Sequence, residues 1–132
     1  IDALAERFKD VQIDAVYSSD LDRAKETAGA LLRGRNLALH TTRELREIHM
    51  GVWEGDSWGN LSYQWPEQMY NFNNDPDNWS VPGCESFERC RVRMTRAIEE
   101  IARAHDGETV GIVAHGSHWL PPDGTIRRRT ER

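Results

Sequence analysis

The order strand, helix, strand across residues 14–41 restricts the possible folds more than any other feature of this sequence. Small, β-branched and aromatic residues predict a buried strand at 14–18. Apolar residues then recur at helical spacing over 20–33, and residues 37–41 predict a second strand. Two strands joined by a helix at this spacing form a βαβ unit, so we expect a parallel sheet covered by helices.

The helix of this unit begins in an unusual way. Ser19 stands at the N-cap position and Asp22 follows three residues later, which is the outline of a capping box. Arg23 then places a cation in the first turn, where the helix dipole disfavours positive charge. Two interpretations stay open. Arg23 is either a surface residue paired with Asp20 or Glu26, or it binds an anion such as phosphate.

The remaining chain predicts further helices and one more strand. Residues 2–10 predict an amphipathic helix, and an apolar stripe after Ser86 predicts a helix that ends near His105. Residues 109–114 form a short apolar run that is typical of a strand buried on both faces. The region 53–79 is rich in aromatic residues, which we expect to pack over the sheet edge or, alternatively, to line a substrate pocket.

The last segment, residues 117–132, differs in character from the rest. It contains two adjacent prolines, a glycine and a run of arginines, and it shows no hydrophobic periodicity. We therefore expect this tail to be poorly ordered.

Composition excludes several classes of function. With 132 residues, 38% of them hydrophobic, the chain can bury the core of one domain. The formal net charge of -5 argues against broad nucleic-acid binding, so an anionic ligand must be held by local cations. Cys84 and Cys90 match neither a redox pair nor a metal site, and free thiols fit the reducing cytoplasm. No apolar run is long enough to span a membrane.

Two residues stand where ligands bind in open α/β sheets, at the carboxyl ends of strands. Arg23 is the first. His115 is the second, because it directly follows the apolar strand and precedes Gly116. Its imidazole could donate a hydrogen bond to an anion or act in proton transfer, whereas the simpler interpretation is a histidine satisfied at a strand end. His118 lies three residues on, but a pair of histidines without further ligands is a weak indication of metal.

Glu47 is a third candidate, in a loop that also carries His49 and Gly51. A carboxyl group beside a bound phosphate could protonate a leaving alkoxide. Spacing alone favours an ordinary surface glutamate, and Glu54 and Glu85 compete for the same role.

Four motifs in order are similar to those of a known family. YSSDLDRAKETA, LREIHMGVWEG, PGCES and VAHG together resemble the histidine phosphatase superfamily in its phosphoglycerate-mutase-like branch, over about residues 3–116. The resemblance implies a three-layer α/β/α fold with a mainly parallel sheet and phosphoryl transfer through a phosphohistidine. It implies no metal or organic cofactor. The implied ligand is a small phosphorylated substrate or inorganic phosphate.

The resemblance also implies roles for the residues named above. Arg23 matches the arginine that binds the phosphate, and Glu47 matches the general acid and base. His115, followed by Gly116, matches the histidine that contacts the phosphoryl group.

The sequence departs from the family at both ends. No Arg-His-Gly motif, which carries the family's nucleophilic histidine on the first strand, occurs here, and Cys84 stands where relatives usually have glycine. We therefore expect residues 1–116 to be a partial histidine-phosphatase-like domain that lacks the first, central strand. We expect residues 117–132 to be an atypical tail in place of the family's C-terminal helix.

These features predict a phosphomonoester hydrolase that acts on a small phosphorylated metabolite, with the phosphohistidine supplied by a missing upstream segment. The chain alone is then expected to be inactive. A phosphoglycerate-mutase-type transfer is the alternative, although the short connection from Glu47 to His115 resembles the small phosphatases more. The motifs are also compatible with a non-catalytic phosphate-binding relative or with an inactive fragment.

Overall fold

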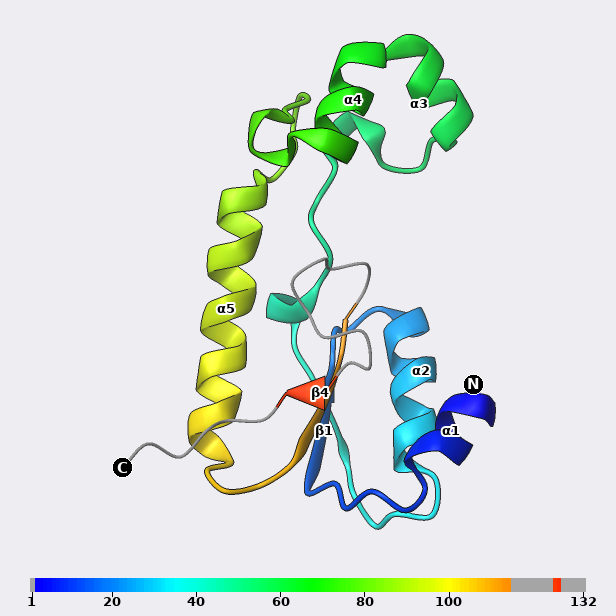
Figure 1. Cartoon of the computed structure of the whole chain (residues 1–132), viewed down its shortest axis with the longest axis vertical. Coiled ribbons are helices and arrows are strands. Elements are labelled where there is room, and N and C mark those ends of the chain that lie inside the picture. The colour runs from blue at the N-terminus through cyan, green and yellow to red at the C-terminus, as the bar shows by residue number, and fades with distance from the viewer. Residues whose placement is uncertain (1, 115–124, 127–132) are drawn as a thin grey trace. The chain divides into compact units, whose positions relative to one another are not determined.

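The computed structural model describes residues 2–114 and 125–126. Its helices and strands follow one another in this order: α1 (Asp2–Phe8), β1 (Ala15–Ser18), α2 (Asp22–Leu32), β2 (Leu39–Thr41), η1 (Arg43–Leu45), η2 (Gly51–Trp53), α3 (Trp58–Gln64), α4 (Pro66–Asn74), η3 (Pro76–Asn78), α5 (Phe87–Ala104), β3 (Val110–Val113) and β4 (Thr125–Ile126) (Figure 1). The chain divides into two compact units, residues 1–47 with 94–132 and residues 48–93, which are described separately. No helix in the described ranges is both long and apolar enough to cross a membrane.

The first unit is built on a sheet with the strand order β2-β1-β3-β4. Strand β1 pairs in parallel with β2 and with β3, and Ser18 lies opposite both Thr41 and Val113. The predicted parallel βαβ unit is therefore confirmed. The two-residue strand β4 pairs antiparallel with β3, which the irregular composition of the tail did not predict. The other residues of the tail lie outside the described ranges.

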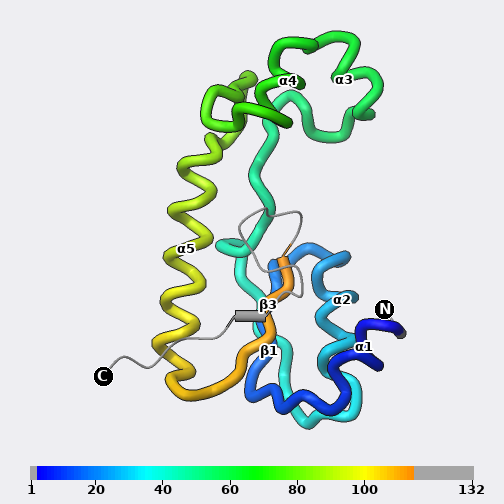
Figure 2. Tube along the Cα trace, in the orientation of Figure 1, coloured from blue at the N-terminus to red at the C-terminus, as the bar shows by residue number. Residues whose placement is uncertain are grey.

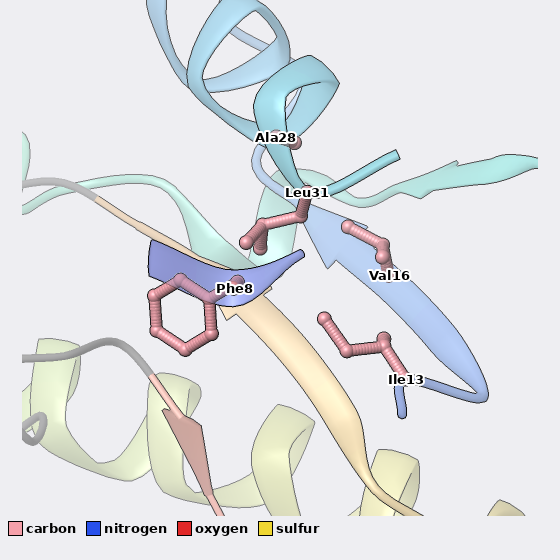
Figure 3. Close-up of a cluster of buried hydrophobic side chains, with 5 residues drawn as sticks. All are labelled: Phe8, Ile13, Val16, Ala28 and Leu31. Atoms are coloured by element: carbon pink, nitrogen blue, oxygen red, sulfur yellow. The ribbon is translucent and has the colours of Figure 1, made fainter. Parts of the chain in front are cut away.

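Side chains of β1 alternate between the two faces of the sheet, and each face is covered. Val16 points toward α2 and packs with Phe8, Ile13, Ala28 and Leu31 in a buried hydrophobic cluster (Figure 3). Helix α1 packs in turn against α2 (Figure 2).

The opposite face of the sheet is met by the C-terminal end of α5. The Tyr17 hydroxyl lies 2.8 Å from Nε2 of His105, just after α5, and the Tyr17 ring stacks on His40. Helices on both sides of the sheet confirm the three-layer α/β/α architecture.

Arg35 joins the ends of two helices in this unit. Its guanidinium donates hydrogen bonds to the carbonyl oxygens of Leu31, Phe8 and Val11, at 2.5, 2.6 and 2.5 Å. Phe8 ends α1, and Leu31 lies in the last turn of α2. The last carbonyls of a helix have no partner within it and carry the negative end of the helix dipole, so one cation satisfies both ends.

Replacing Arg35 with alanine should destabilise the chain measurably. Three charge-assisted hydrogen bonds are lost together, and we expect the free energy of unfolding to fall by about 2–3 kcal/mol. Urea unfolding followed by circular dichroism measures it. Arg96→Ala, an exposed arginine on α5, is the control and should change stability by less than about 0.5 kcal/mol. An equal loss in both variants would contradict the role of Arg35.

The second unit is held together by aromatic side chains. Trp53 and Trp79 are buried, and each lies within 5.7 Å of the Phe72 ring, centroid to centroid. Phe87 packs on both Phe72 and Trp79. The aromatic residues of 53–79 therefore pack largely on one another. Tyr63 and Tyr70 remain exposed at the surface of this unit.

Helix α5 begins as the sequence predicts. The hydroxyl of Ser86 accepts a hydrogen bond from the amide of Arg89, which is an N-cap contact. The apolar stripe that follows is mostly buried, with Cys90 and Met94 at 1% and 0% exposure. Cys84 and Cys90 are both free thiols.

Two loops of the second unit are bound to each other through their main chains. Met50 and Cys84 form an antiparallel bridge, and the amide of Glu85 donates to the carbonyl of His49 at 2.8 Å. Gly51 lies inside this contact with φ of 58°, and a Cβ placed there would lie 2.2 Å from the carbonyl oxygen of Pro82. Only glycine fits this position, because both the backbone conformation and the space exclude a side chain.

Gly51→Ala should therefore destabilise the second unit by at least about 2 kcal/mol, since it adds left-handed strain to a clash with backbone. Gly59→Ala is the matched control. Gly59 lies in α3 with nothing within 4 Å of the added methyl group, so that variant should be neutral or more stable by up to about 1 kcal/mol. Tryptophan fluorescence during urea unfolding reports on Trp53 and Trp79. Equal stability of the two variants would rule out the close approach at Gly51.

Candidate functional site

Three loops of the first unit start at the same edge of its sheet. β1, β2 and β3 run parallel, so their carboxyl ends meet there. Backbone hydrogen bonds continue past the strands: the amide of Thr42 donates to the carbonyl of Ser18, and the amide of Ser19 donates to that of Val113. Ligands bind at this edge in open α/β sheets.

The predicted site residues follow these strands, and the structure describes two of them. Arg23 follows β1 in the first turn of α2, and Glu47 follows β2 just after η1. Both belong to the first unit. His115 and Gly116 come directly after the end of β3 but lie outside the described residues, as does His118.

The prediction that Ser19 caps α2 in a capping box with Asp22 is wrong. The N-cap residue is Leu21, and it makes no side-chain capping hydrogen bond. Ser19 is fully buried and continues the path of the strand, because its amide is bound to Val113. Its hydroxyl accepts a hydrogen bond from the amide of Leu21 at 3.5 Å, so it supports the turn before the helix. The first turn of α2 thus begins without a side-chain cap.

Arg23 is exposed. Within the described ranges its guanidinium makes no hydrogen bond and no ion pair, and neither of the expected partners, Asp20 or Glu26, holds it. This removes the simplest structural explanation for a cation in the first turn. The guanidinium is available to bind an anion with two parallel hydrogen bonds.

Asp20 is instead held by Arg46, a residue that no sequence pattern singles out. Nε of Arg46 lies 2.6 Å from Oδ1 of Asp20, and Nη2 lies 2.7 Å from Oδ2. The hydrogen bond from Arg46 lowers the pKa of Asp20 below its ordinary value, and the charges of Arg46 and Arg43 act in the same direction against partial burial. No signal in a single sequence indicates this pairing, because the two residues are far apart along the chain.

Glu47 is exposed, and in the part of the chain that the structure describes its carboxyl group has no hydrogen-bond or ion-pair partner. The two other candidate glutamates, Glu54 and Glu85, accept hydrogen bonds from the protein. Glu54 accepts a hydrogen bond from the amide of Met50 at 2.7 Å. Glu47 is therefore the candidate with a carboxyl group free to exchange protons with a ligand.

Glu85 is held more firmly. Its carboxylate accepts two hydrogen bonds from Arg93, each 2.9 Å long, and one from the amide of His49. Burial alone would raise the pKa of Glu85, but the hydrogen bonds from Arg93 and His49 outweigh it, so the pKa lies below its ordinary value. A carboxylate kept ionised in this way is a poor proton donor.

Among the described residues no three histidine, cysteine, aspartate or glutamate side chains come together as they would around a metal ion. At this edge of the sheet Arg23 lies in the first turn of α2 and Glu47 lies on the loop after β2, and neither side chain has a partner in the described ranges. The helix N-terminus with Arg23 suits a phosphate dianion, and the carboxyl group of Glu47 suits proton transfer to or from a phosphate ester.

Known proteins are similar to this chain. The family model described as histidine phosphatase superfamily (branch 1) matches residues 1–119. The metal-independent phosphoserine phosphatase of Arabidopsis thaliana is 38% identical over 119 residues, which are 86% of this chain and 49% of that protein. Phosphoglycerate mutase-like protein 4 of the same plant is 36% identical over 132 residues, covering 98% of this chain and 54% of that protein.

A solved structure agrees with these sequence matches. Mycobacterial glucosyl-3-phosphoglycerate phosphatase in complex with VO3 superimposes with a TM-score of 0.78 at 28% identity, over 87% of this chain and 58% of that chain. The chain spans about half the length of the curated relatives that it matches. A family match over most of the sequence, with the same fold, shows that this chain belongs to the histidine phosphatase superfamily.

Proposed function

We propose that this chain forms the phosphate-binding and proton-transferring part of a phosphomonoester hydrolase. The observation that carries the proposal is the exposed guanidinium of Arg23, which no side chain neutralises among the described residues, at the carboxyl edge of a parallel sheet. The vanadate complex of a structural relative supports it, because vanadate imitates a phosphoryl group.

Each residue then has a role in the first half of the reaction. Arg23 binds two oxygens of the phosphoryl group, and His115 donates a hydrogen bond to a third. A histidine from outside this chain takes the phosphoryl group, because the sequence contains no Arg-His-Gly motif. Glu47 gives its proton to the leaving alkoxide, so that an alcohol departs.

The second half of the reaction reverses the role of Glu47. Its carboxylate removes a proton from water, the oxygen of that water attacks the phosphohistidine, and inorganic phosphate leaves. A small phosphorylated metabolite is the proposed substrate. The cytoplasm is the proposed location, because both cysteines are free thiols.

Two other functions have a specific observation in their favour. A mutase-type transfer to a second substrate is supported by the mutase-like relative of Arabidopsis thaliana. Binding of phosphate without catalysis is supported by the presence of Arg23 together with the absence of an Arg-His-Gly motif from this sequence.

Vanadate binding by the 132-residue chain tests the anion site. Arg23→Ala should weaken binding by at least about tenfold, because a charge-assisted pair of hydrogen bonds is lost. Lys25→Ala is the matched control, since it removes the same charge from an exposed residue of the same helix. Isothermal titration calorimetry measures both. Equal affinities of the two variants, or a parent chain that does not bind, would refute the site.

Catalysis is tested by joining the N-terminal segment of the phosphoserine phosphatase relative to this chain. The chimera should release inorganic phosphate from alkyl phosphates, and Glu47→Gln should slow this by about 10²–10⁴-fold. Glu26→Gln, on the exposed face of α2, is the control and should keep the full rate. A folded chimera that binds vanadate without turnover would favour the non-catalytic function. Transfer of phosphate to a second substrate in place of water would favour the mutase.

A further inference from the structure

We propose that Arg46 is a positioning residue, which places Glu47 beside the phosphate held by Arg23 through its paired hydrogen bonds with Asp20. The proposal rests on the proposed function, because it concerns the geometry of the same site. Asp20 lies close to Arg23 along the chain and Arg46 directly precedes Glu47, and the side chains of Asp20 and Arg46 form a direct link between these two segments.

The Asp20 end of the link is attached to the start of α2. The preceding residue, Ser19, is bound to Val113 through its amide and to Leu21 through its hydroxyl. The carbonyl of Leu21 accepts the first helical hydrogen bond, from the amide of Lys25. The carboxylate of Asp20 is thus fixed relative to the turn on which Arg23 stands.

The Arg46 end is attached to the loop after β2. The amide of Thr42 is bound to the carbonyl of Ser18, and its hydroxyl accepts from the amide of Glu44. Leu45 is completely buried, and the amide of Arg46 closes the turn on the carbonyl of Arg43. Glu47 is the next residue, so the direction of its main chain depends on where Arg46 is held.

The geometry of the pair is what makes it suited to positioning. A guanidinium that donates from Nε and Nη2 to both oxygens of one carboxylate fixes the plane and the direction of approach, which a single contact does not. The two side chains are 41% and 30% exposed. Ion pairs so open to solvent contribute little to stability, so their main effect here is on geometry.

The pair also affects the charge around the anion. Without Arg46, the carboxylate of Asp20 would repel a phosphate dianion bound three residues away at Arg23. With Arg46 the two charges cancel locally, so that Asp20 no longer opposes the attraction of Arg23 for the ligand. The lowered pKa of Asp20 agrees with a carboxylate that stays ionised within this pair.

The test uses the isotope-labelled 132-residue chain and inorganic phosphate. Phosphate should shift both the Nε resonance of Arg23 and the carboxyl carbon resonance of Glu47 in nuclear magnetic resonance spectra. In Arg46→Gln the Arg23 shift should persist at saturating phosphate, with an affinity weakened by the uncompensated carboxylate of Asp20, while the Glu47 shift falls by at least about half. Asp20→Asn has nearly the same shape as aspartate and removes that carboxylate, so it should give the same fall in the Glu47 shift without the loss of affinity, also where Arg46→Gln fails to fold.

Arg91→Gln is the matched control. Arg91 also pairs with carboxylates at the surface, those of Asp77 and Glu88, and it is 37% exposed, but it belongs to the other unit. Both resonances should shift in this variant as in the parent. If the Arg46 or Asp20 variant merely disturbed the fold, the phosphate affinity and the shifts of both the Arg23 and the Glu47 resonances would fall together.

The outcomes separate the two proposals. If the parent chain binds no phosphate, the proposed function is wrong and the positioning role is wrong with it. If Arg23 responds to phosphate and Glu47 responds equally in the parent and in both variants, only the positioning role of Arg46 is overturned. Loss of the Glu47 response alone, in Arg46→Gln and in Asp20→Asn, supports it.

Discussion

The parallel pairing of β1 with both β2 and β3 is the constraint on which the candidate site depends. Because Ser18 lies opposite Thr41 on one side and Val113 on the other, three strands end at the same level. The segments that leave these ends therefore start at the same edge, and the contact between Asp20 and Arg46 links two of them. This is the edge at which ligands bind in open α/β sheets.

Arginines secure segments in both units, and each of these arginines uses more than one nitrogen of its guanidinium. Arg35 binds backbone carbonyls from two helix ends, Arg46 binds Asp20, and Arg93 binds Glu85. Lysine carries the same charge but cannot bind two acceptors in a fixed plane. In a chain with a net charge of -5, such local pairs let cations serve both structure and ligand binding. Arg23 differs from these three because no protein acceptor among the described residues holds it.

The sequence predicts the elements of this fold well where hydrophobic periodicity is strong. Apolar residues at helical spacing predict α5, and a short continuous apolar run predicts β3, because the residues of both patterns are buried. The cap at Ser86 is predictable because its hydroxyl binds an amide only three residues away. The start of α2 was not predictable in the same way, because it depends on a hydrogen bond between Ser19 and Val113, which are far apart along the sequence. The pairs of Asp20 with Arg46 and Glu85 with Arg93 also depend on tertiary structure. Motif resemblance indicated Arg23 and Glu47, but only the structure separates Glu47 from the engaged Glu54 and Glu85.

The close approach of Gly51 to Pro82 has a consequence for how sequences of this kind can diverge. The two loops that meet there belong to the motifs LREIHMGVWEG and PGCES, which lie far apart along the chain. A residue with a side chain at position 51 requires the main chain at 82–84 to follow a different path. Substitutions or insertions in either loop should therefore occur together with changes in the other. Among homologous sequences, the two motifs should vary as a single inherited unit.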